Sequence, residues 1–171
     1  MTKLGVRFEP LPAISSEACG AAYPLRVSSL PNGVEVTPPA TMVCPVAEAL
    51  ARWTLEVVAV EAARHLESQP RRIAIGTSYE CRSRNRQPGA KLSEHAFANA
   101  VDVSGFAFDA KKAVQIGDHP AEVPEASFQN AIRTQACAYF TTVLGPGSDP
   151  SHATHLHLDL RERGHGFRIC Q

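Results

Sequence analysis

The sequence predicts an α+β domain in which a small central antiparallel sheet packs against two main helices. Two long runs with apolar residues at helical spacing predict the helices, and short β-branched segments predict roughly four to six strands. Turn sequences that join antiparallel neighbours separate several of these strands, which argues against alternating β and α units. With 171 residues, the chain is long enough for one sizeable core.

The first part of the chain predicts an arm followed by a hairpin. Residues 1–18 are polar, contain prolines and show no periodicity, so we expect a surface arm ahead of a single domain over residues 19–171. Residues 25–37 then alternate polar and apolar side chains around the turn Pro31–Gly33. Because this turn chemistry joins antiparallel strands, residues 25–37 predict a β-hairpin.

A long amphipathic run predicts the main core helix. Residues 46–66 carry apolar side chains at helical spacing, and Pro45 stands where a proline favours a helix start. Trp53 lies on the apolar stripe, so we expect it in the core. The short β-branched segment 72–79 then predicts a buried strand that leads into an irregular loop over residues 80–92.

The second half predicts another hairpin and a second helix. Residues 99–108 and 111–116 have the composition of two strands around a short turn. Residues 125–144 have apolar side chains at helical spacing and are followed by Gly145-Pro146-Gly147, a strong helix breaker. We therefore expect the second helix to cover the whole range 125–144.

Histidines and carboxylates gather in two short segments. Near the C-terminus, polar and apolar residues alternate as in a strand, so His155, His157 and Asp159 should share one face. An earlier segment holds His95 and, at the start of an expected strand, Asp102. Zinc binds neutral imidazole and carboxylate groups, and three protein ligands leave a fourth position open for water. His95, Asp102 and His157 are therefore a candidate metal site.

A family resemblance rests on the same two segments. The spacing SxHxxxxAxD over residues 93–102, followed by HxH, resembles the zinc peptidases grouped as lysostaphin, D-Ala-D-Ala metallopeptidases and sonic hedgehog. The pattern HxxHxH at residues 152–157 is similar to that of penicillin-insensitive murein endopeptidases. The strings SYECRSRN, SEHAFANAVD, TVLGPGSDPSHATHLHLDL and FRIC resemble the extensin-like C-terminal domain family of bacteria. This resemblance covers the chain from Cys19 onward.

The resemblance implies a zinc-dependent peptidase that cleaves an amide bond in a peptidoglycan stem peptide or crosslink. It implies a zinc ion on one face of the sheet, and catalytic, proton-handling roles for His155 and His152, which are not needed as ligands. It also implies that Ser93 orients the site through a hydrogen bond and that Arg82 binds substrate. Asp159 could support a metal ligand from behind.

Three alternatives stay open at this level. The domain could be a non-catalytic zinc-binding module that recognises cell-wall peptide or a protein, or it could have a structural role at the cell envelope without zinc. The basic loop with Arg82, Arg84, Arg86 and Lys91 could be a solvated face or an anchor for a substrate carboxylate.

Ala98 stands where the resembling families usually have glycine, and its methyl group matters if the backbone there has positive φ.

The net charge and the hydropathy of the chain argue against a nucleic acid partner and against a membrane span. The 17 basic and 17 acidic side chains cancel, so no sequence-wide field favours a nucleic acid. We find no apolar stretch long enough for a membrane span and no apolar core of a signal peptide. We expect a peptidoglycan peptide as partner and a periplasmic or cell-envelope location, with export by a signal or anchor outside this chain.

Five cysteines are many for a reducing compartment, and they form no CxxC pair. We expect disulfides between Cys19 and Cys44, which bracket the first hairpin, and between Cys137 and Cys170, which would tie the C-terminal tail to a helix. Cys81 is then left as a buried free thiol, or as a fourth metal ligand that would close the site.

Overall fold

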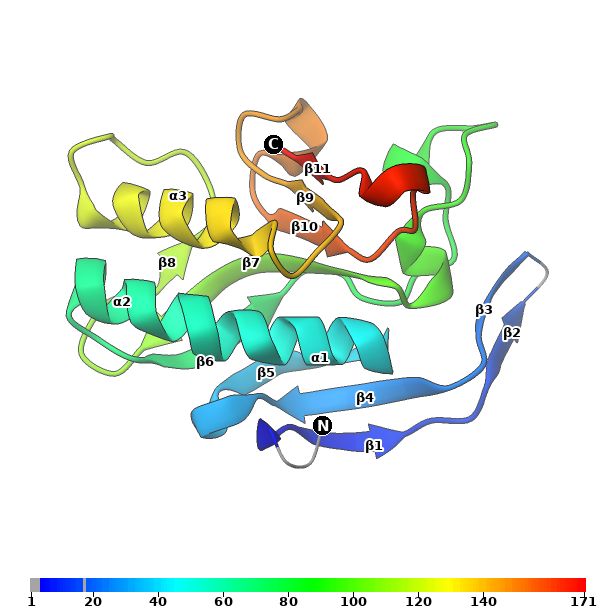
Figure 1. Ribbon diagram of the computed structural model, residues 1–171, viewed down its shortest axis with the longest axis horizontal. Coiled ribbons are helices and arrows are strands. Elements are labelled where there is room, and N and C mark those ends of the chain that lie inside the picture. Colours follow the sequence, from blue (N-terminus) through cyan, green and yellow to red (C-terminus); the bar gives the residue numbers. More distant parts are fainter. Residues whose placement is uncertain (1–3, 17) are drawn as a thin grey trace.

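The computed structural model of the chain describes residues 4–16 and 18–171 (Figure 1). It contains one large sheet and a separate two-stranded ribbon, β2 (Ile14–Ser16) with β3 (Cys19–Ala21). The strands of the large sheet are β1 (Arg7–Pro10), β4 (Pro24–Ser29), β5 (Glu35–Val43), β6 (Pro70–Ile75), β7 (Ala100–Phe108), β8 (Val114–Gln115), β9 (Thr142–Leu144), β10 (Leu156–Asp159) and β11 (Ile169–Cys170).

The α+β class is confirmed, but the expected small antiparallel sheet is wrong. The sheet has nine strands in the order β1-β4-β5-β6-β7-β10-β9-β11, with β8 paired to β7. It is mixed, because β5 pairs with β6 and β9 pairs with β11 in parallel. The main helix connects β5 to β6 and supplies the long crossover that a parallel pair requires. The residues of turns could not reveal that β5 pairs with β6, because the main helix separates these two strands in the sequence.

The main helix forms where its apolar spacing predicts it. It consists of α1 (Cys44–Trp53), a π-helical turn (Thr54–Val58) and α2 (Ala59–Leu66) in direct succession. Pro45 lies in its first turn, and the helix ends where Glu67 adopts the left-handed conformation. Trp53 is fully buried, as expected, and its indole N–H donates to the carbonyl of Ile132 on the second helix.

The second helix is shorter than the sequence predicts. It is α3 (Pro124–Ala136), and residues 142–144 form strand β9 instead of the last helical turn. The apolar residues Phe140, Val143 and Leu144 fit either structure by spacing, but β9 gains backbone partners from β10 and from β11. Strand pairing therefore decides a short apolar run that periodicity leaves ambiguous.

Both predicted hairpins are present. Strands β4 and β5 are antiparallel neighbours around the turn Pro31–Gly33, in which Asn32 and Gly33 have φ of 59° and 74°. Strands β7 and β8 form the second hairpin. Part of the expected surface arm belongs to the sheet, because β1 pairs with the edge of β4 and Val6 is buried. Residues 1–3 and 17 of that arm lie outside the described residues.

The helices cover one face of the sheet, and the hydrophobic core lies between the helices and that face (Figure 1). Leu156 and Leu158 of β10 are fully buried in this core, together with Val101 and Val103 of β7. Since side chains alternate along a strand, the intervening polar residues of β7 and β10 point to the opposite face. The helix-covered face therefore anchors the strands that carry the candidate site.

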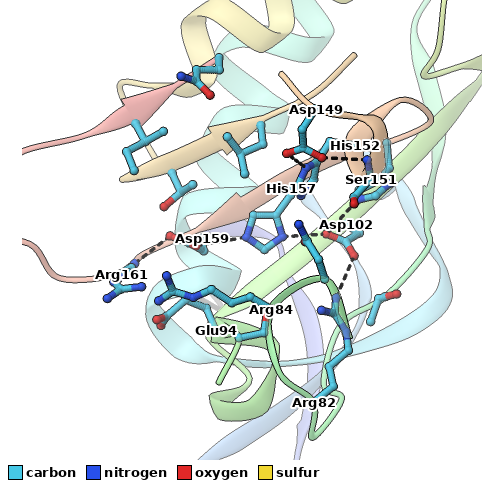
Figure 2. A pocket seen from close by; sticks show the side chains of 18 of the residues that line it. Arg82, Arg84, Glu94, Asp102, Asp149, Ser151, His152, His157, Asp159 and Arg161 are labelled. Carbon is cyan, nitrogen blue, oxygen red and sulfur yellow. Dashed lines mark hydrogen bonds and ion pairs between the residues drawn. The ribbon is translucent and has the colours of Figure 1, made fainter. Parts of the chain in front are cut away.

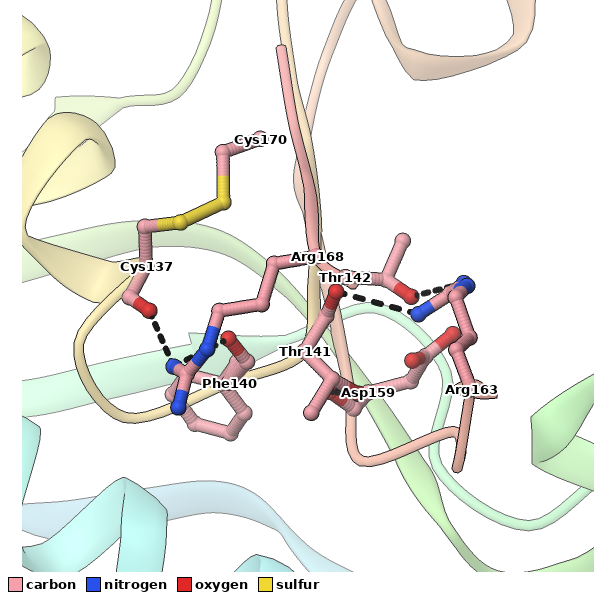
Figure 3. The surroundings of a disulfide bond; sticks show 8 residues. All are labelled: Cys137, Phe140, Thr141, Thr142, Asp159, Arg163, Arg168 and Cys170. Atoms are coloured by element: carbon pink, nitrogen blue, oxygen red, sulfur yellow. Dashed lines mark hydrogen bonds between the residues drawn. A yellow bond between two sulfur atoms is a disulfide. The ribbon is translucent and has the colours of Figure 1, made fainter. Parts of the chain in front are cut away.

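One of the two expected disulfides is correct. Cys137 and Cys170 are bonded, and the bond holds β11 near the end of α3. Figure 3 shows Arg168 beside this bond, where its guanidinium donates to the carbonyls of Cys137 and Phe140. Arg163 clamps the same tail by donating to Thr142 Oγ1 over 2.6 Å.

The other expected pairing, Cys19 with Cys44, is wrong. Cys19 is bonded to Cys81, with the two Cα atoms 5.7 Å apart. Strand β3 lies against the short helical turn Glu94–Phe97, which brings Cys19 to the loop that carries Cys81. Cys44 starts α1 with an exposed, free thiol. The sequence suggested Cys44 because Cys19 and Cys44 bracket the same hairpin. The position of Cys19 depends instead on the packing of β3 against the turn Glu94–Phe97.

Within residues 4–16 and 18–171, no helix has the length and apolar character that crossing a membrane requires. The two disulfides fit an exported or extracellular protein, since such bonds persist in oxidising compartments.

Candidate metal centre

Two of the three candidate ligands face each other across neighbouring strands. His157 of β10 stands directly opposite Asp102 of β7 in the antiparallel register. Directly opposed side chains on one face lie close enough to interact. His157 Nδ1 is 2.9 Å from Asp102 Oδ1, and both side chains are largely buried. The strand pairing alone therefore builds two thirds of the site.

The third ligand comes from a tight turn. His95 lies in the turn Glu94–Phe97, and its Nε2 is 3.1 Å from both Asp102 Oδ1 and His157 Nδ1. The turn ends at Ala98, which has a φ of 52° and a fully buried side chain. The departure from glycine thus falls on a left-handed backbone, a conformation that costs alanine about 1–2 kcal/mol. The turn forms nevertheless.

In His95 and His157, the ring nitrogen that points away from Asp102 faces a hydrogen-bond acceptor and therefore carries the proton of the neutral ring. His95 Nδ1 lies 2.5 Å from the carbonyl of Ser78, which can only accept, so this nitrogen carries the proton. His157 Nε2 lies 3.1 Å from Asp159 Oδ2, which likewise accepts. In their neutral forms both rings therefore turn an unprotonated nitrogen toward Asp102. Two lone pairs and a carboxylate oxygen converge on one point, an arrangement that only a proton or a cation can stabilise.

The spacing of these atoms suits a small cation. The three ligand atoms lie 2.9 to 3.1 Å from one another. Metal bonds of about 2.0–2.2 Å at a tetrahedral angle would place such atoms about 3.3–3.6 Å apart, so a slight expansion would accommodate the ion. The buried group His95, Asp102 and His157 could therefore bind a metal ion.

The pKa values of the buried side chains also favour a positive charge at this position. Burial raises the pKa of Asp102, but hydrogen bonds from His157 and His95 outweigh burial and hold this pKa well below its usual range. Burial lowers the pKa of His157, but the carboxylates of Asp102 and Asp159 outweigh it and raise this pKa to about 9. A proton on His157 thus occupies the place of a cation, and a metal ion would have to displace it.

His152 lies beside this group in a carboxylate-held orientation. Its Nδ1 is 2.7 Å from Asp149 Oδ2, while Asp149 Oδ1 accepts from the backbone N–H of Ser151 (Figure 2). His152 is mostly buried, and its ring centroid is 5.7 Å from that of His157. Because Nδ1–H donates a hydrogen bond to the carboxylate, the neutral ring keeps an unprotonated Nε2. Sequence reasoning missed Asp149, although its position three residues before His152 is typical of a capping aspartate.

His155 lies next to the candidate metal ligands His95, Asp102 and His157, but just before β10 and not within it. Its Nε2 is 3.6 Å from Asp102 Oδ1, and its ring centroid is 5.3 Å from that of His152. Burial lowers the pKa of His155; Asp102 opposes this effect, and the neighbouring histidines add to it. The sequence-predicted histidines are thus all brought together, and His155 favours its neutral form.

A cleft of about 580 Å³ opens over these histidines. Arg82 lines it, with Nε donating to Glu80 over 2.9 Å and Nη2 4.0 Å from Asp102 Oδ2. Burial raises the pKa of Glu80, but its bonds to Arg86 and Arg82 outweigh burial and lower it. Ser93 also lines the cleft, yet its hydrogen bonds within the described residues run through its backbone. Arg82 therefore lies near the candidate metal ligand Asp102 without an ion pair or hydrogen bond to His95 or His157.

Comparison with known proteins assigns the chain to a family. The family model described as extensin-like protein C-terminus matches residues 1–171. The chain belongs to this family. No curated protein and no solved structure matches it.

In this extensin-like domain, strand pairing and one turn gather residues that are far apart in sequence. The predicted strand contributes His157 and its supporting Asp159, whose Oδ1 also accepts from the backbone N–H of Arg161. The sequence analysis did not identify three groups that hold site residues in place, namely Asp149, Glu80 and the carbonyl of Ser78. A backbone carbonyl leaves no trace in residue type, so Ser78 could not have been found from the sequence.

Proposed function

We propose that this extensin-like domain is a zinc-dependent hydrolase of amide bonds in bacterial peptidoglycan peptides, acting in the periplasm or cell envelope. The observation that carries the proposal is the convergence of His95 Nε2, His157 Nδ1 and Asp102 Oδ1, which all offer lone pairs to one point when both rings are in their neutral forms. Two imidazoles and one carboxylate are a ligand set of catalytic zinc sites, in which a further position stays open. The motif resemblance to murein endopeptidases supplies the substrate class.

Zinc bound there would polarise a scissile carbonyl and lower the pKa of a bound water toward about 7. His155, with its lowered pKa and its place beside Asp102, is suited to accept a proton from the attacking water. His152 is suited to the opposite task, because Asp149 holds its Nδ1 and leaves Nε2 to pass a proton to the leaving amine. Two histidines in different surroundings would thus share the proton transfers.

The cleft and Arg82 support a peptide substrate. Arg82 is held by Glu80 and keeps further N–H donors toward the cleft, where they could orient a substrate carbonyl or carboxylate. Asp159 would hold His157 in its ligand orientation, and Ser93 would add a hydroxyl to the wall of the cleft.

The presence of two histidines outside the ligand set favours hydrolysis over a recognition module. A module that only binds needs neither a neutral imidazole beside the ligand carboxylate nor a second imidazole held by its own carboxylate. His155 and Asp149-bound His152 supply both in the same cleft.

Metal analysis and a peptidase assay test the proposal together. The purified chain should hold one zinc ion, and zinc-loaded protein should release cleaved products from purified muropeptides, detected by mass spectrometry. His157→Ala should lose most of the zinc and all measurable cleavage, because one of three protein ligands is gone. His119→Ala, in an exposed loop, is the matched control and should retain both. Stoichiometric zinc in folded His157→Ala would refute the ligand set, and zinc-loaded wild type without cleavage would refute the hydrolase.

A further inference from the structure

Two arginines near the metal-binding group have no acidic partner among the described residues. Arg82 and Arg86 both pair with Glu80, and most other arginines contact a carboxylate, a carbonyl or a hydroxyl. No ion pair or side-chain hydrogen bond is formed by Arg84 or Arg161 within residues 4–16 and 18–171. Their guanidinium groups are therefore available to an external anion.

The two arginines come from different segments but border the same space. Both line the cleft over the histidines, and both also line a neighbouring cleft of about 840 Å³. Figure 2 shows Arg84 extending toward the side of the site on which Arg161 lies. They therefore stand where the two clefts meet.

Their backbones are held in place relative to the metal-binding group. The N–H of Arg161 donates to Asp159 Oδ1, and the other oxygen of the same carboxylate contacts the ligand His157. The N–H of Arg84 donates to the carbonyl of Lys91 across the base of its loop. A ligand between the two arginines would thus be held at a defined distance from the candidate metal position.

Basic side chains outnumber acidic ones where the two clefts meet. Glu94 lines both clefts, but its carboxylate accepts from the side chain of Asn99 over 2.8 Å, and Asp159 is engaged with His157. The second cleft is also lined by one further acidic and one further basic side chain, the exposed Glu162 and Lys91, so these two add no net charge. Within the part of the chain that the structure describes, none of these three carboxylates forms an ion pair with Arg84 or Arg161.

We infer that Arg84 and Arg161 form a subsite for a carboxylate of an acidic peptide, a refinement that rests on the proposed peptidase function. Guanidinium groups match a carboxylate through paired N–H donors. The second cleft continues beyond them with the apolar side chains of Leu92, Phe97 and Leu160, which suit the aliphatic part of the same ligand. The substrate is thus a peptide with a free carboxylate displaced from the scissile bond, and Arg84 and Arg161 select it.

The test compares binding of matched peptides with and without carboxylates. Muropeptides with acetylated amines are divided, and one half is converted to carboxamides with carbodiimide and ammonia. Dissociation constants are measured by calorimetry on the full chain as purified, in a His155→Ala background that slows turnover. We expect roughly tenfold tighter binding of the carboxylate form, the size of a charge-assisted contact. Arg84→Gln and Arg161→Gln should each remove most of this preference.

Arg7→Gln is the matched control, since Arg7 is an exposed arginine on the distant edge strand β1, and it should keep the preference. Equal affinity for both peptide forms, no binding of either, or an unchanged preference in both arginine variants would overturn the inference. A retained preference together with zinc-loaded wild type that cleaves nothing would refute the proposed hydrolase and leave the subsite standing.

Discussion

Removing the Cys19–Cys81 disulfide should cost a large part of the stability of the chain. The bond closes a loop with a sequence separation of 62 residues. The chain-entropy model assigns such a loop about 4 kcal/mol at 25 °C. Because whole domains of this kind are stable by about 5–15 kcal/mol, Cys81→Ala should lower the denaturation midpoint strongly. Guanidinium denaturation followed by circular dichroism measures this change.

Cys44→Ala provides the matched control for this prediction. Its thiol is free and exposed, so its loss should change the free energy of unfolding by less than about 0.5 kcal/mol. If Cys19 were instead bonded to Cys44, the loop of about 25 residues would be worth about 3.5 kcal/mol, and Cys44→Ala would show that loss. A stable Cys81→Ala variant beside a destabilised Cys44→Ala variant would therefore refute the observed pairing.

The same disulfide should also matter for the site. Cys81 directly precedes Arg82, so the bond ties the ribbon of β2 and β3 to the start of the loop that carries the arginine. Losing the bond should raise the KM for peptide more than it lowers zinc content, because His95, Asp102 and His157 are held by strands and a separate turn. Zinc loss parallel to the loss of binding would contradict this separation of roles.

Three further predictions concern the histidines. Since the pKa of His157 is raised to about 9, binding of zinc below that pH must displace its proton. Zinc affinity should therefore rise about tenfold per pH unit from about pH 7 toward pH 9 in chelator-competition titrations, and a flat profile would disprove the displacement. His155→Ala should keep zinc and fold but cost about 10²- to 10⁴-fold in kcat; loss of zinc would make His155 a ligand. Asp149→Asn should leave zinc in place and lower kcat roughly 10- to 100-fold by releasing the ring of His152, whereas wild-type turnover would remove Asp149 from the mechanism.

Local patterns predicted the elements that depend on neighbouring residues. The alternation after His155 correctly separates His157 and Asp159 from Leu156 and Leu158, which are fully buried. The long apolar stripe correctly predicts the main helix. Both succeed because side-chain direction follows directly from the period of a strand or helix.

Predictions failed where two structures share one local pattern. The run at Phe140, Val143 and Leu144 reads as the end of a helix, yet β10 and β11 convert its second half into β9. The position of β6 beside β5 in parallel likewise depends on where the main helix returns the chain. Partners that are distant in sequence supply these hydrogen bonds, so spacing alone cannot reveal them.

By itself, the sequence predicted which side chains could bind a metal and on which face of their strand His157 and Asp159 stand. His95, Asp102 and His157 were recognisable as residues suited to bind a metal, and Cys137 with Cys170 as a bonded pair. Only the tertiary structure decided that these three ligand atoms converge, that Asp149 holds His152 and that Cys19 is bonded to Cys81. The reason is physical: residue type and period are local, whereas convergence depends on strand register and on turns that join segments many residues apart.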